Sequence, residues 1–368
     1  MSVTAYDIPA LRTDVEDRTR GGAPPAASGR HATMRLSALL RWVLLAAAIA
    51  FMSRSIAGGW PEITQAVEAL SSRDAAWLVI VVLIEAAWVV TLAQVYRSSL
   101  IAFGGSARHR EALRVSMGAF TLSRVLPGGG AVGALLAARE FVRVGNGGPV
   151  TLLALVTAGW VSLVTLTTGV AIGIGVGLVS GLLSPGLLFA PGAILAVLVT
   201  VGAVGRLAVR SPHWRRRLFG IMERVFSRWA PDMTREELEA ALVNQSRVRI
   251  GSILQVGGWS AIGWVLDATA LWMVFAIFGQ QLDLGVLSVG YGIANLIQAL
   301  PELTPGWLGV LEGSLSLTYA GFGVPLATGM LAVLGYRLVS FWLPVLAGVP
   351  HALSIVGIRR RRHMERGE

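Results

Sequence analysis

The sequence predicts an all-α, polytopic membrane protein, and three observations lead to that prediction. Hydrophobic residues make up 54% of the 368 residues and charged residues only 14%, whereas an average soluble domain is about one quarter charged. The apolar residues come in blocks of ~20 or more, the length at which a helix crosses the hydrocarbon core. From Phe141 to Met222 there is no acidic residue. A soluble protein would not leave so long a part of its surface without a carboxylate.

Six blocks are continuous enough to form full transmembrane helices. They are Leu36–Ser53, Ala75–Tyr96, Pro149–Val179, Leu187–Val209, Ser252–Phe278 and Gly329–Ile358. Residues 36–358 are therefore expected to form one membrane domain. Residues 1–35 are mixed in charge and lack an apolar period, which predicts a disordered cytoplasmic tail. Residues 359–368 are expected to form a basic cytoplasmic tail.

Two further apolar regions are interrupted by Arg, Glu, Pro and clustered Gly, and each predicts a pair of half-length helices. They are Leu113–Gly145 and Gly285–Phe322, and they resemble each other at a fixed offset of 176 residues. The offset pairs Gly130 with Gly306, Gly133 with Gly309, Gly145 with Gly321, and Pro149 with Pro325. Broken hydrophobic segments at matching places in two repeats indicate a transport site near the bilayer midplane.

Arginine placement predicts the orientation, because cytoplasmic loops are enriched in basic residues. Arginines concentrate in 97–114, in 206–249 and at 359–362, so both termini are expected in the cytoplasm of a plasma-membrane protein. The spans then alternate correctly only if both interrupted regions are re-entrant and related as an inverted repeat. The net charge of +10 is attributed to contact with anionic lipid rather than with nucleic acid.

The central loop, residues 210–249, is expected to lie in the cytoplasm and to touch the membrane surface. Apolar residues fall on one helical face between Trp214 and Trp229, with arginines among them, as in an interfacial amphipathic helix. An ordinary solvated loop helix is the alternative.

Several ionisable residues lie within or beside the apolar segments, where each charge costs roughly 2.5–3.5 kcal/mol at a helix centre. Two interpretations are open. In the first, arginines bind an anionic head group while carboxylates pair with them or carry protons. In the second, the charges form structural ion pairs, such as Glu312 with Arg337, and Arg139 and Glu140 lie at the cytoplasmic rim. The residues are Glu85, Arg124, Arg139, Glu140, Asp267, Glu302, Glu312 and Arg337.

Other motifs do not support catalysis or a cofactor. The chain has no cysteine, and its five histidines are scattered, so neither a metal site nor any other cofactor is expected. The glycines at 128–133 match a dinucleotide fingerprint, but they lack the strand and the following acidic residue that such a site needs. Gly169, Gly173 and Gly177 predict a helix-packing face.

One stretch resembles a known family. Pro301-Glu-Leu-Thr-Pro-Gly-Trp-Leu-Gly-Val-Leu-Glu312, followed by Tyr336-Arg337, is similar to the C-terminal signature of the lysylphosphatidylglycerol synthase transmembrane-region, or flippase-like, family. The resemblance covers roughly 36–358 and implies a membrane domain that moves lipids between leaflets. It implies substrate-binding roles for Pro305, Gly306, Gly309, Glu312 and Arg337. Trp307 departs from the family pattern, which has a second Gly after the Pro.

We therefore expect a stand-alone domain that translocates an anionic or phosphate-bearing lipid, with Arg124, Arg139 and Arg337 neutralising the head group and Glu302 and Glu312 gating or carrying protons. Lysyl-phosphatidylglycerol and polyprenyl-phosphate glycolipids are both candidates. No synthase activity is expected, because the chain ends ten residues after the last predicted span. The alternatives are a membrane-embedded transferase acting on a lipid phosphate and a non-catalytic subunit of an envelope glycolipid complex. The expected partners are membrane lipids, with a homo-oligomer or an envelope-biosynthesis partner left open.

Overall fold

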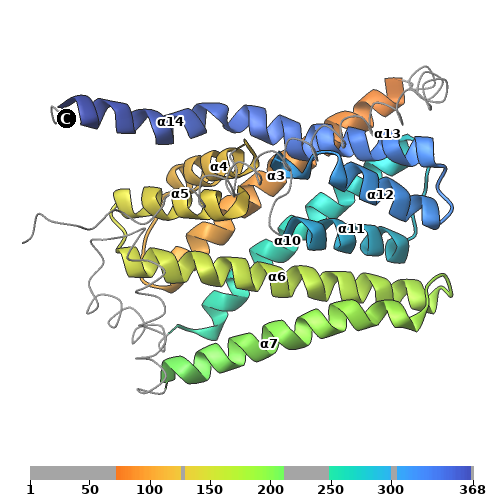
Figure 1. Ribbon diagram of the computed structural model, residues 1–368, viewed down its shortest axis with the longest axis horizontal. Helices are drawn as coiled ribbons and strands as arrows, with labels where there is room; N and C mark the ends of the chain where they lie inside the picture. The colour runs from red at the N-terminus through yellow and green to blue at the C-terminus, as the bar shows by residue number, and fades with distance from the viewer. Residues whose placement is uncertain (1–71, 126–128, 211–247, 300–304, 366–368) are drawn as a thin grey trace, which may run out of the picture.

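The computed structural model describes residues 72–125, 129–210, 248–299 and 305–365, and this part of the chain is helical throughout, without a strand (Figure 1). The predicted first span, the tail 1–35, most of the loop 210–249 and Glu302 lie outside the described residues. The first half contains α3 (Ser72–Ala102), α4 (His109–Val125), α5 (Gly129–Arg143), α6 (Gly148–Val179), η2 (Pro185–Leu188) and α7 (Phe189–Arg210). The second half contains α10 (Ile250–Ile277), α11 (Leu284–Ala299), η3 (Pro305–Trp307), α12 (Val310–Gly321), α13 (Leu326–Arg337), η4 (Leu338–Trp342) and α14 (Leu343–Glu365).

Five helices of the described part are long and apolar enough to cross a membrane. They confirm the last five predicted spans to within a few residues at most ends. Helix α3 continues six residues beyond the predicted end at Tyr96, and α14 continues seven residues beyond the predicted end at Ile358, into the segment predicted as a tail. The last span is not one regular helix. A π-helical segment, η4, separates α13 from α14, and such bulges occur mostly at functional sites.

Both interrupted regions form the predicted pairs of short helices. The pairs are α4 with α5 and α11 with α12, each helix having 17 residues or fewer, which is below the ~20 needed to cross the hydrocarbon core. Helices of one pair lie against each other. Each pair is followed by a long apolar stretch that starts next to a proline, Pro149 or Pro325.

The order long helix, short pair, long helix therefore occurs twice, as α3–α6 and as α10–α14. The two sets are interleaved rather than separate. Helices α3 and α10 pack along each other, α4 packs on α14, and α11 packs on α6. Such reciprocal packing is what a two-fold relation between repeats produces, while the direction of each set relative to the membrane stays a prediction.

Glycines allow this reciprocal packing at both interfaces. On α6, a Cβ at Gly173 would meet Ser288 and one at Gly177 would meet Gly285, both on α11. Between α4 and α14, a Cβ at Gly348 would meet the side chain of Thr121. Small residues at helix interfaces let backbones approach in a membrane, where packing rather than exclusion of water holds helices together. The predicted packing face of α6 is thus observed for two of its three glycines. Gly169 packs against no other helix.

One long helix stands apart from the rest. Figure 1 shows α7 alongside α6 at the edge of the bundle, and only 6% of its span is buried. The large hydrophobic core surrounds α10, α11, α12 and α13, so the densest packing lies beside the second short pair. That packing positions the polar residues described next.

Candidate functional site

A small polar pocket of about 90 Å³ lies inside the helical bundle. Side chains from the C-terminal ends of α4 and α11 line it, together with residues of α10, α12, α13 and η4. The α4 and α11 ends are the points at which the two short pairs break. The pocket therefore lies where the two interrupted regions meet.

Arg124 connects the two breaks. It lies in the last turn of α4, and its Nη1 donates a hydrogen bond of 2.9 Å to Gln298 Oε1, 174 residues away near the end of α11. The guanidinium carbon lies 5.0 Å from the ring centroid of Phe120 and 5.8 Å from that of Phe341, within the range of cation–π attraction. These contacts hold the guanidinium of Arg124 at the junction of the two short helix pairs.

Asp267 forms the acidic side of the pocket. Its two carboxyl oxygens accept hydrogen bonds from the hydroxyls of Tyr291 (2.6 Å) and Tyr336 (2.5 Å). Arg124 is close enough to act electrostatically on this carboxyl group. The two tyrosines come from α11 and α13, so Asp267 on α10 ties three helices together.

Glu85 on α3 lies beside Asp267 and is only 1% exposed. Neither of its carboxyl oxygens has a hydrogen-bond donor within reach among the described residues. Two adjacent carboxyl groups can hydrogen-bond to each other only when one of them holds a proton. The Glu85–Asp267 pair is therefore suited to bind and release a proton at the centre of the bundle.

Glu312 and Arg337 form a buried ion pair. Arg337 Nε donates to Glu312 Oε1 at 2.7 Å, and Arg337 Nη2 donates to the Gly306 carbonyl at 2.8 Å. The other carboxylate oxygen of Glu312 accepts from the backbone N–H of Gly309 at 2.6 Å. Both side chains are nearly inaccessible, at 1% and 4% exposed. This clamp holds the broken backbone before α12 against α13, which corresponds to the structural interpretation left open above.

The clamped backbone has an unusual conformation. Gly306 and Gly309 have φ angles of 58° and 81°, a region that glycine adopts readily. Trp307 lies between them with φ 57°, the one non-glycine residue with positive φ in the described part of the chain. Such a conformation costs roughly 1–2 kcal/mol for a residue with a Cβ. The Trp307 side chain is buried to 2% exposure, and its packing offsets that cost.

The other predicted site residues lie away from the pocket or, as with Glu302, outside the described residues. Arg139 on α5 is exposed and does not line the pocket. Glu140 is buried and pairs with Arg143 at 2.7 Å and with Arg114 at 3.6 Å, as an ion pair away from the pocket. The backbone of Pro305 starts η3. Within the described ranges, no group of three His, Asp or Glu side chains could hold a metal ion.

A family model described as the lysylphosphatidylglycerol synthase TM region matches residues 36–348. The chain belongs to this family. A UPF0104 membrane protein of the archaeon Methanothermobacter thermautotrophicus is 27% identical over 175 residues, 43% of this chain and 49% of the relative. A second match to a UPF0104 membrane protein of that organism is 33% identical over 86 residues, 23% of this chain and 25% of the relative. The chain thus spans about half the length of these curated relatives, or less.

Membership in the lysylphosphatidylglycerol synthase transmembrane-region family agrees with a role of this membrane protein in lipid handling. The family signature around Pro305, Glu312 and Arg337 coincides here with the clamp, and Arg337 also lines the polar pocket. Sequence reasoning missed Gln298, Tyr291, Tyr336 and Asn295, which line the pocket. Uncharged polar residues in an apolar helix give a weak signal. Their recurrence at 291, 295 and 298 on one face of α11 could have identified them.

Proposed function

We propose that this protein moves an anionic or phosphate-bearing lipid between the two leaflets of the plasma membrane, with both termini in the cytoplasm and without enzymatic activity. The observation that carries the proposal is Arg124, whose guanidinium lies in a polar pocket between the two broken helix pairs. Charged side chains in transmembrane segments are costly and typically mark a substrate or ion pathway.

The chemistry of the pocket fits the phosphate of a lipid head group. Arg124 offers a positive charge, and the side-chain amides of Asn295 and Gln298 offer neutral donors. With about 90 Å³, the pocket accommodates a phosphate-sized group rather than a complete glycolipid head. Binding a larger head group therefore needs the two short pairs to separate around the Arg124–Gln298 contact.

Arg124, Arg139 and Arg337, which the sequence predicted would neutralise the head group together, have different roles in this proposal. Arg124 binds the anion, whereas Arg337 holds the break before α12 in shape through Glu312 and Gly306. Arg139 interacts with solvent or lipid head groups at the surface. Inverted-repeat transporters often place broken helices around a site that opens to each side in turn, and the interleaved packing of α3–α6 with α10–α14 supports that arrangement.

Reconstitution of the purified protein into liposomes tests the function. We expect a fluorescent anionic phospholipid to cross between leaflets faster than in protein-free vesicles, and a zwitterionic analogue with the same chains to cross more slowly. Equal rates with and without protein, for both lipids and for a labelled polyprenyl phosphate, would refute the proposal. In that case, product formed from a lipid phosphate would favour the transferase, and a stable complex with other envelope proteins the non-catalytic subunit.

The buried carboxyl pair predicts coupling to protons. An imposed proton gradient should change the net rate of lipid movement in the wild type, because Glu85 and Asp267 lie beside the anion pocket. Glu85→Gln keeps the shape and removes the titrating group, so its rate should not respond to the gradient. Glu140→Gln is the control, since Glu140 is also buried but pairs with two arginines. If the wild-type rate did not change with the proton gradient, lipid movement would not be coupled to protons.

A further inference from the structure

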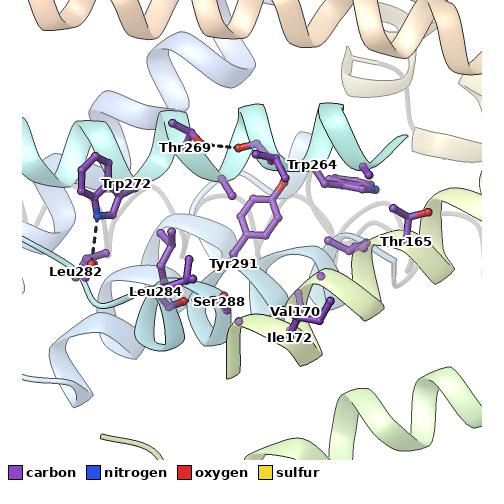
Figure 2. A pocket seen from close by; sticks show the side chains of 17 residues that line it. Thr165, Val170, Ile172, Trp264, Thr269, Trp272, Leu282, Leu284, Ser288 and Tyr291 are labelled. Carbon is purple, nitrogen blue, oxygen red and sulfur yellow. Dashed lines mark hydrogen bonds between the residues drawn. The ribbon is translucent and has the colours of Figure 1, made fainter. Parts of the chain in front are cut away.

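A second, larger hollow lies beside the polar pocket, between α6, α10 and α11. Its volume is about 610 Å³, and Figure 2 shows the side chains that line it. Some lining residues, such as Ile172 and Val265, are more than 60% exposed. The hollow is therefore a groove on the outer surface of the bundle, which faces lipid in a membrane. We refer to it as the apolar groove.

The polar side chains in the groove have their hydrogen bonds satisfied within the protein. The hydroxyls of Thr165, Thr269 and Ser288 each donate to a backbone carbonyl of their own helix. The indole N–H of Trp272 donates to the Leu282 carbonyl at 3.2 Å (Figure 2), and that of Trp264 to a carbonyl of α6 at 3.1 Å. None of these donors is directed at a ligand, so the groove suits hydrocarbon and not a head group.

The groove and the polar pocket share a wall. Trp264 and Tyr291 line both spaces, with ring centroids 6.3 Å apart. In Figure 2, Tyr291 reaches from α11 toward α10, between Trp264 and Trp272, and its hydroxyl bonds to Asp267 in the polar pocket. The side chains of Trp264 and Tyr291 thus lie between the groove and the polar pocket that holds Arg124.

We propose that the apolar groove binds one acyl chain of the glycerophospholipid whose head group enters the polar pocket. The inference rests on the proposed function and adds the class of lipid. From Ala261 to Trp272 the groove follows α10 over eleven residue steps, a rise of ~16 Å. One leaflet of the hydrocarbon core is about 15 Å thick, half of the ~30 Å total. An acyl chain fits that length, whereas a long polyprenyl chain extends well beyond it.

Gly169 provides a way to fill the groove without disturbing the packing. It lines the groove, and a Cβ built on it meets nothing within 4 Å. Gly169→Leu therefore places a side chain in the space assigned to the lipid. Gly175→Leu is a matched control on the same helix, because Gly175 also has open space around it but does not line the groove. Thermal melting in detergent should show both variants folded like the wild type.

Photolabelling tests the binding site directly and does not depend on transport. Wild-type protein in vesicles is illuminated with an anionic phospholipid carrying a diazirine on one acyl chain, and labelled peptides are located by mass spectrometry. We expect labels to concentrate on α6 around Gly169 and on α10 between Trp264 and Trp272. The lipid-facing residues Val199, Val201 and Val204 of α7, each 58% exposed, report the background from surrounding lipid. Gly169→Leu should reduce groove labelling to that background, and Gly175→Leu should not.

Each result bears on one proposal. Groove labelling equal to that of α7 in the wild type, or unchanged in Gly169→Leu, would overturn the inference. A polyprenyl phosphate probe that labels the groove while the phospholipid does not would overturn the choice of lipid. If wild-type protein moves lipid and Gly169→Leu moves it as fast, the groove is not used and the proposed function stands. If the groove is labelled but no lipid crosses, the proposed function fails and the binding site stands.

Discussion

Replacing Glu312 by alanine is expected to lower the free energy of unfolding by about 3–5 kcal/mol, the range found when one partner of a buried ion pair is removed. The change would leave Arg337 charged at 4% exposure and would leave the Gly309 N–H without its acceptor. The break before α12 would then lose the contacts that hold its left-handed backbone. Unfolding of the purified variant in detergent, followed by tryptophan fluorescence, measures the effect.

A double-mutant cycle separates the ion pair from the other contacts. Arg337→Ala should be about as destabilising as Glu312→Ala, because each single variant leaves one buried charge unpaired. The double variant leaves neither charge, so it should cost clearly less than the sum of both. Glu111→Ala is the control, since that carboxylate caps α4 near the surface and its loss should cost about 1 kcal/mol. A loss below about 1 kcal/mol for Glu312→Ala would show that the clamp is not what stabilises this turn.

Replacing Arg124 by glutamine is expected to slow the transbilayer movement of an anionic lipid about 10- to 100-fold. A hydrogen bond to a charged group contributes about 1.5–3 kcal/mol, and each ~1.4 kcal/mol is a factor of ten. Glutamine retains a polar side chain near Gln298 but removes the positive charge of Arg124, while Arg337 stays paired with Glu312. The liposome assay described above measures the rate, with melting temperatures to confirm that the fold is intact.

Arg139→Gln is the matched control for this variant. It removes one positive charge from the same helix pair, but Arg139 is exposed on α5 and does not line the pocket. Its rate should stay close to that of the wild type, and Arg124→Lys should recover part of the lost activity. If Arg139→Gln were as slow as Arg124→Gln, the site would lie on the surface of α5 and the pocket would not be the substrate site.

The long helices were predictable to within a few residues at most ends because their signal is local. A helix in hydrocarbon satisfies its backbone hydrogen bonds internally, so a run of ~20 apolar residues is sufficient to specify α6 or α10. The breaks in both short pairs were also predictable, since Gly, Pro and charged residues interrupt the apolar pattern there. The π-helical segment η4 at Leu338–Trp342 was not predicted, although Pro344 cannot donate a helical hydrogen bond to the carbonyl of Ser340.

The site was predictable only in part. From the sequence, Arg124, Arg139 and Arg337 were predicted to share a role at the head group, with an ion pair for Arg337 and a rim position for Arg139 as alternatives, and the structure gives each a different environment. The sequence offered the Glu312–Arg337 ion pair as one of two interpretations, and the structure contains it, but nothing in the sequence showed that Glu85 adjoins Asp267. Charge in an apolar segment indicates that a partner is needed, but it does not identify the partner.

The sequence by itself determined that this chain is a helical membrane protein of the lysylphosphatidylglycerol synthase transmembrane-region family, with two helix pairs broken at matching places. Hydrocarbon imposes those features segment by segment, so no distant contact is needed to infer them. Only the tertiary structure decided which residues meet. Arg124 reaches Gln298 across 174 residues, and Asp267 reaches Tyr336 across 69. These residues, far apart in the sequence, come together because α3 and α10 pack against each other and because each broken pair lies against a long helix of the other half. No local sequence pattern encodes that packing.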